Sequence, residues 1–199
     1  PWIESYGSVC GKKEWDGPLG ELFDESFLDT TLGESTWEKA ESRLQTEAVE
    51  IALQKGNLEQ QDIDVLFAGV LLNQCISSTF GLRGLDIPFL GQYGACSTMG
   101  QALCMAAVFA ENGSADRAIA VTSSHFCSAE RQFRFPLEYG GQRAPTAQWT
   151  VTGAGAAVVT AGDTFPKKPP SRTEGQVRSR RIVIRHMTLG RMADLGVAD

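Results

Sequence analysis

The segment from Ser97 to Asn112 constrains the fold most, because nearly all of its residues are small or apolar. This composition predicts a helix, and a helix without a polar face has to be buried on all sides. Asn112-Gly113 supplies a stop signal at its end. This helix is therefore expected to lie between other layers of structure, because a single sheet would cover only one of its sides.

A second helix is predicted from Trp37 onward, where apolar residues recur at helical spacing up to Ile51. Ser35-Thr36-Trp37-Glu38 has the form of a capping box, in which a hydroxyl cap is followed three residues later by a carboxylate. Lys55-Gly56 ends the helix. The expected helix has about five turns and one apolar face.

Short apolar runs rich in β-branched and aromatic residues predict strands. They cover residues 62–69, 87–90, 117–123, 149–160 and 181–188. Residues 1–34, which are punctuated by glycine, are expected to form a loop. Residues 125–148 are expected to form a long loop, and its aromatic content favours a functional loop over disorder. Strands that alternate with helices predict an α/β fold, with a mixed sheet and helices on its faces.

Composition and charge exclude several classes of protein. With 42% hydrophobic and 21% charged residues, the chain is typical of a globular protein. No apolar stretch approaches the ~20 residues of a membrane span. No signal peptide opens the chain, and its first residue, Pro1 rather than Met, suggests that the sequence is trimmed at its start.

Residues 167–185 carry seven basic residues against Glu174 alone. This segment is interpreted as a solvated surface loop, with a patch for anionic lipid or another protein as the alternative. Nucleic acid is not an expected partner, because no aromatic residue after Phe165 lies among these charges.

The five cysteines form no C-x-x-C pair, which argues against a zinc site or a disulfide framework and favours a reducing compartment. Cys96 is the cysteine that is a candidate for a reactive thiol. It follows a short predicted strand and opens the helix from Ser97, where free N–H groups and the helix dipole favour a thiolate. Spacing alone leaves two alternatives open, a nucleophile and an inert buried cysteine.

Other candidate residues lie near strand ends. His125 opens the long loop and is either a ligand contact or a structural hydrogen-bonding residue. Asn73 is either a donor to a ligand oxygen or a turn cap. Arginines of the long loop suit a dicarboxylate, because guanidinium binds carboxylate in bidentate fashion, but they also pair with local acids such as Glu130 or Glu138. These arginines are Arg131, Arg134 and Arg143.

Several segments resemble a known superfamily. Gly94-Ala95-Cys96-Ser97-Thr98 before an apolar helix resembles the nucleophile turn of thiolases and ketoacyl-synthase-type condensing enzymes. The segment 152–159 resembles the glycine-rich strand that closes the first half of that fold. More specific segments, in the same order, resemble the stage V sporulation protein AD family. They are residues 13–20, 71–74, 122–125, 129–136, 138–142, 190–191 and 194–196.

This resemblance implies a thiolase-like α/β fold, with a mixed five-stranded sheet and helices on both faces. Residues 1–199 would form the first of two similar halves, with the second half absent from this chain. It also implies a homodimer, paired through the strand at 117–123. The family is expected to act in the cytoplasm or forespore, peripherally on the spore inner membrane.

The implied function is binding of dipicolinic acid (pyridine-2,6-dicarboxylate), alone or as its calcium chelate, for uptake into the forespore and release at germination. Membrane proteins of the same sporulation operon are the implied partners. The resemblance places the ligand near Cys96, and with Ser97, His125, Asn73 and Arg131 this residue forms the expected binding set. No metal site and no further cofactor are expected.

The alternative is an acyltransferase of the thiolase or ketoacyl-synthase type. Cys96 would be the nucleophile, and the backbone N–H groups of Ser97 and Thr98 would lie near the reacting carbonyl. A nucleophilic thiol needs a base within hydrogen-bond reach. The histidine that serves thiolases as base comes from the second half, so this sequence favours a non-catalytic binding protein over the enzyme.

Overall fold

The computed structural model describes residues 1–133, 146, 148–162, 181–191, 193 and 196. Its strands are β1 (Trp2–Gly11), β2 (Glu25–Phe27), β3 (Val65–Gly69), β4 (Phe89–Gln92), β5 (Arg117–Ser124), β6 (Gly153–Thr160) and β7 (Ile182–Val183). Its helices are α1 (Lys12–Trp15), α2 (Trp37–Gly56), α3 (Ile76–Leu82), α4 (Thr98–Glu111) and α5 (Phe126–Phe133). None of these helices is long and apolar enough to cross a membrane.

One mixed sheet organises the chain, in the order β2-β1-β6-β5-β3-β4, with β7 paired to β1. β3 is parallel to β4 and β5, whereas β6 is antiparallel to both β5 and β1. The expected α/β class and mixed sheet are confirmed. The described sheet has seven strands where five were expected, because the short strands β2 and β7 extend it beside β1.

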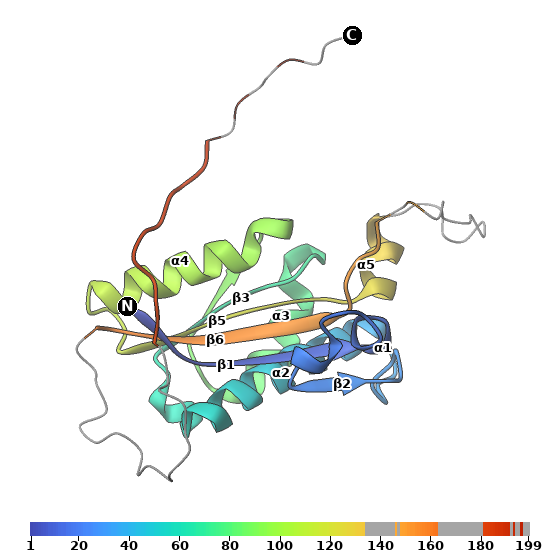
Figure 1. The fold of residues 1–199 in the computed structure, drawn as a ribbon, viewed down its shortest axis with the longest axis horizontal. Coiled ribbons are helices and arrows are strands. Elements are labelled where there is room, and N and C mark those ends of the chain that lie inside the picture. The colour runs from blue at the N-terminus through green and yellow to red at the C-terminus, as the bar shows by residue number, and fades with distance from the viewer. Residues whose placement is uncertain (134–145, 147, 163–180, 192, 194–195, 197–199) are drawn as a thin grey trace.

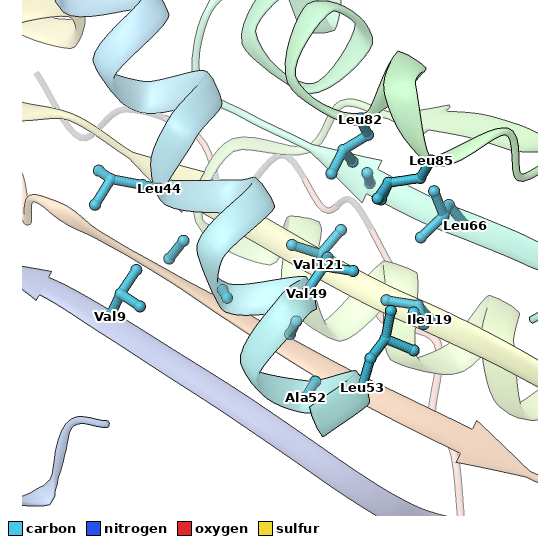
Figure 2. Packing of buried hydrophobic residues seen from close by; sticks show 14 of the residues in the cluster. Val9, Leu44, Val49, Ala52, Leu53, Leu66, Leu82, Leu85, Ile119 and Val121 are labelled. Carbon is cyan, nitrogen blue, oxygen red and sulfur yellow. The ribbon is translucent and has the colours of Figure 1, made fainter. Parts of the chain in front are cut away.

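Helices cover the two faces of the sheet, with α2 and α3 on one side and α4 on the other (Figure 1). On the α2 face, Leu44, Val49 and Leu53 pack over Ile119 and Val121 of β5 (Figure 2). On the other face, alanines of α4 pack against β3 and β5 in a second buried cluster. Each face therefore has its own apolar core.

The glycines of residues 1–34 led to a wrong prediction, because Trp2–Gly11 is a ten-residue strand and only the rest is loop and short elements. Gly7 lies where α2 crosses β1. A Cβ at this position would lie 2.2 Å from the carbonyl oxygen of Ala48. Glycine here permits close approach of the helix and does not interrupt the strand.

Helix α2 is confirmed with its end at Gly56, but its cap is Thr36, whose side chain accepts a hydrogen bond from the backbone N–H of Lys39. The long loop is corrected at its start, where Phe126–Phe133 forms helix α5. Much of its remainder, including Arg134 and Arg143, lies outside the described residues. So does most of the basic segment 167–185.

The other strand predictions are confirmed in place and changed in length. The run at 149–160 becomes a strand only from Gly153, and the run at 181–188 forms only the two residues of β7. Dimer pairing through residues 117–123 is wrong, because β5 lies inside the sheet and is hydrogen-bonded to β3 and β6.

Helix α4 differs from expectation on its outer side. Ala102, Ala106 and Ala107 are fully buried against the sheet, whereas Val108 is 40% exposed. Leu103 and Cys104 are only partly buried. The prediction that the helix is buried on all sides is therefore not met within the described part of this chain, which covers one face of the helix.

Candidate functional site

A tight turn between β4 and α4 presents Cys96. Ala95 has a left-handed backbone with φ of 47°, an unfavourable conformation for a residue with a side chain. Thr98 holds this turn together: its hydroxyl accepts from the N–H of Gly94 at 3.1 Å and donates to the carbonyl of Ala95 at 2.8 Å. The Cys96 side chain is exposed at the tip. The sequence-based placement of Cys96 between a strand and a helix is confirmed.

The turn rests closely on the end of β3. A Cβ at Gly69 would lie 2.2 Å from the carbonyl oxygen of Gln92 and 2.5 Å from the Cγ2 of Thr98. Only glycine leaves room for both neighbours. The position of Cys96 therefore depends on a backbone contact between two parts of the chain that are well separated in sequence.

Cys96 lines an open hollow of about 680 Å³ at the end of the sheet. Its walls come from the carboxyl ends of β3 and β5, the first residues of β6 and the segment Trp149–Val151. Ligands of open α/β sheets bind at this edge, beyond the carboxyl ends of the strands. None of the described residues that line this Cys96 hollow carries a charge. It therefore offers hydroxyls, an amide, a thiol and backbone groups.

Ser97 belongs to the same turn, but its hydroxyl donates to the carbonyl of Gly94 at 2.6 Å. Its side chain is thus used within the turn. Its role in binding stays a prediction.

His125 lies on the other side of Trp149, in a separate cavity of about 350 Å³. Its Nε2 lies 2.7 Å from the carbonyl oxygen of Thr30 and its Nδ1 accepts from the N–H of Cys127 at 3.2 Å, so the Nε2 carries the proton. Burial lowers the pKa of this imidazole. Both nitrogens are occupied in a neutral ring, and this arrangement favours the structural alternative for His125.

Asn73 and Arg131 line a third hollow, of about 570 Å³. Arg131 forms an ion pair with Glu38, and its guanidinium lies 5.4 Å from the ring centre of Trp37. The backbone N–H of Asn73 donates to the side chain of Gln132 at 3.3 Å. Of the five predicted residues, Cys96 and Ser97 share one turn, Asn73 and Arg131 share the third hollow, and His125 lies in a separate cavity. The ligand contacts of all five remain predictions.

Sequence reasoning missed a buried polar cluster beside the Cys96 hollow. Glu41 and Gln45 of α2 are fully buried, and both are linked to Ser123 at the end of β5. Burial raises the pKa of Glu41 to about 7, against the opposing effect of hydrogen bonds from Ser128, Ser123 and Ser77. The sequence did carry a signal: Glu41 lies three residues before Leu44 and Gln45 three before Ala48, and this spacing places both on the side of the helix that carries the apolar stripe.

Cys96 is expected to be alkylated first when the native protein is treated briefly with iodoacetamide. It is exposed, whereas Cys10 and Cys75 are buried. Burial raises the pKa of Cys10 to about 11 and also raises the pKa of Cys75. Thiolate is the reactive form, so these two thiols should resist. Mass-spectrometric mapping gives the order of labelling, and faster reaction of Cys10 or Cys75 would contradict this picture.

Comparisons with known proteins identify the family. The family model for stage V sporulation protein AD matches residues 1–199. The stage V sporulation protein AD of Bacillus subtilis (strain 168) is 44% identical over 198 residues, which cover 100% of this chain and 54% of that protein. The chain thus spans about half the length of this curated relative.

Solved structures with a similar fold include 3-oxoacyl-[acyl-carrier-protein] synthases III. The 3-oxoacyl-[acyl-carrier-protein] synthase III of Aquifex aeolicus VF5 has a TM-score of 0.55 at 19% identity, over 81% of this chain and 54% of that one. A variant of Xanthomonas campestris OleA has a TM-score of 0.56 at 17% identity, over 83% of this chain and 57% of that one. These likenesses show a thiolase-like fold, of which this chain covers about half. By its match along the whole sequence, the chain belongs to the stage V sporulation protein AD family.

Proposed function

We propose that this chain is the amino-terminal half of a spore protein that binds dipicolinic acid in the Cys96 hollow. In this role the protein supports uptake of the acid into the forespore and its release at germination. The observation that carries the proposal is a hollow at the carboxyl ends of the strands, in which Cys96 is displayed at the position where the family resemblance expects the ligand. A binding pocket needs the hollow, whereas thiol catalysis needs the base as well.

The uncharged lining bears on the form of the ligand. Free dipicolinate carries two negative charges, and burying a charge without a partner is strongly unfavourable. Its calcium chelate has no net charge. We therefore propose that the calcium chelate is the form that suits the described walls. Binding of the free dianion would require positively charged groups from outside these walls.

The protein is further proposed to act as a homodimer, peripherally on the spore inner membrane, with membrane proteins of the same operon as partners. Within the described sheet, β4 is an edge strand that pairs only with β3. Leu90 of β4 is 43% exposed. An unpaired strand edge with an exposed apolar side chain is a natural site for pairing with a second copy.

Titration calorimetry of dipicolinate, with and without calcium, into the full-length protein tests the binding proposal. Cys96→Ala is expected to keep saturable binding, because a small side chain leaves the hollow open. Cys96→Trp is expected to abolish binding by filling the hollow. Cys104→Ala is the matched control, since this cysteine lies on α4 outside the described lining and should leave binding unchanged. No saturable binding to the wild type would overturn the proposal.

Acyl transfer by Cys96 is the second candidate, favoured by the strained turn at Ala95, which displays the thiol immediately before a long helix. Incubation with an acyl thioester and mass spectrometry would detect a covalent acyl group on Cys96. A base from outside the described residues would have to accept the thiol proton. Absence of acylation in a full-length protein that binds dipicolinate would remove this candidate.

A further inference from the structure

A carboxyl group that has no cationic partner among the described residues lies in the core directly behind the Cys96 hollow. Glu41 accepts hydrogen bonds from the hydroxyls of Ser123, at 3.1 Å to Oε1, and Ser128, at 2.9 Å to Oε2. Gln45 fixes the direction of the first bond, because its Nε2 donates to the Oγ of Ser123 at 3.0 Å and to the carbonyl of Gly69 at 3.0 Å. Ser123 thus accepts from Gln45 and donates to Glu41.

Among the described residues, the groups that face Glu41 from each packed element are neutral. They are Gln45 on α2, Ser77 on α3, Ser123 on β5 and Ser128 on α5. The two ion pairs nearest to Glu41 in sequence, Arg43 with Glu47 and Glu38 with Arg131, lie at the surface and are self-neutralising. Burial is the largest influence on the pKa of Glu41, and no charged group among the described residues is a cause of its shift.

The hydrogen-bond partners around Glu41 suit both of its protonation states. The Oγ of Ser128 lies 2.9 Å from Oε2 of Glu41 and 3.1 Å from the carbonyl oxygen of His125. When Glu41 is ionised, Ser128 donates to it. When Glu41 is protonated on Oε2, the new O–H donates to Ser128, and Ser128 donates to His125. No polar atom of this set loses its partner in either state, so the core can hold the proton or release it.

Ser123 connects this cluster to the hollow. Among the described residues, six hydroxyl side chains line the Cys96 hollow, and five of them donate to a protein acceptor. Among those five acceptors, Glu41 is the buried carboxyl group whose pKa is raised by burial to about 7. A hydrogen bond to a neutral carboxyl group is weaker than one to a carboxylate. Protonation of Glu41 therefore weakens the hydrogen bond that the Ser123 hydroxyl donates to it.

We infer that Ser123 donates a hydrogen bond to a carboxylate ligand in the Cys96 hollow, and that Glu41 takes up a proton from solvent as the ligand binds. The inference rests on the proposed function and adds a ligand contact and a pH dependence to it. No covalent or redox step is involved. By linkage, a ligand that binds the protonated state better is bound more tightly at low pH.

Calorimetry of dipicolinate binding to the full-length protein at pH 6 and pH 8 tests this inference. The wild type is expected to bind about tenfold more tightly at pH 6, the equivalent of one hydrogen bond to a charged group. Titrations in two buffers with different ionisation enthalpies should show proton uptake at pH 7.5. Glu41→Gln, which cannot titrate, should bind without proton uptake and with the same affinity at both pH values.

Two further variants separate the contact from general effects. Ser123→Ala should bind weakly at both pH values and lose the pH difference. Glu50→Gln is the matched control, because Glu50 is another glutamate of α2 whose pKa is raised, but it is exposed and does not line the Cys96 hollow. This variant should keep the pH dependence of the wild type.

The possible failures are distinguishable. No dipicolinate binding by the wild type at either pH would overturn the proposed function and, with it, this inference. Binding with equal affinity at both pH values and no proton uptake would overturn the inference alone. Equal pH dependence of the unfolding free energy in wild type and Glu41→Gln would also overturn it, whatever the ligand does.

Discussion

The Glu41→Gln substitution is expected to raise the free energy of unfolding above that of the wild type more at pH 8 than at pH 4.5. The gain at pH 8 should exceed the gain at pH 4.5 by about 3 kcal/mol. The cause is the buried carboxyl group, whose pKa rises from 4.5 to about 7 on folding. Because the folded state binds this proton more tightly, the contribution of Glu41 to stability is fully present below pH 4.5. It is lost as the pH rises to 7, and it stays constant above that.

Urea denaturation of both proteins between pH 4.5 and pH 8 measures this difference. Other titrating groups are common to the two proteins, so the gap between their curves isolates Glu41. Glutamine matches the size of the protonated side chain and can hydrogen-bond to Ser123 and Ser128, which makes a packing defect a poor explanation for any change. Parallel curves would show that Glu41 keeps one protonation state throughout this range.

The fold could be predicted well only where a residue pattern depends directly on burial. The apolar stripe of α2 and the runs of β3 and β5 record burial directly, and these elements were predicted near their true bounds. Gly7 indicated a loop because glycine in a sequence signals both a turn and a close contact, and only the packed structure separates the two. Helix α5 was missed because its eight residues are too few to establish a helical period.

The candidate site was predictable where it is local in sequence and not where it is assembled by topology. Gly94, Ala95 and Cys96 are consecutive, and their turn was expected. His125 was assigned to the site because it opens the long loop after β5, and Arg131 because a guanidinium group suits a dicarboxylate. The structure directs them to separate cavities, since α5 turns the chain away from the strand ends. Glu41 was overlooked because a stripe of apolar residues drew attention away from a polar residue on the same face.

Gly69→Ala is expected to disturb the candidate site more than a glycine-to-alanine substitution at any other position in its walls. The new Cβ would lie 2.2 Å from the carbonyl oxygen of Gln92 and 2.5 Å from the Cγ2 of Thr98. Backbone on one side cannot yield as a flexible side chain would, so β4 or the Cys96 turn has to move. Overpacking of this kind lowers the free energy of unfolding by about 3 kcal/mol. Denaturant midpoints measure this loss.

The same substitution is expected to change the alkylation rate of Cys96, because Thr98 fixes the turn through its bonds to Gly94 and Ala95. Gly155→Ala is the matched control. Gly69, Thr122 and Gly155 lie in one register row across β3, β5 and β6, and both glycines line the Cys96 hollow. A Cβ at Gly155 meets no atom within 4 Å. This variant should stay within about 1 kcal/mol of the wild type and keep its alkylation rate. Equal behaviour of the two variants would mean that the contact between β3 and the turn does not hold Cys96 in place.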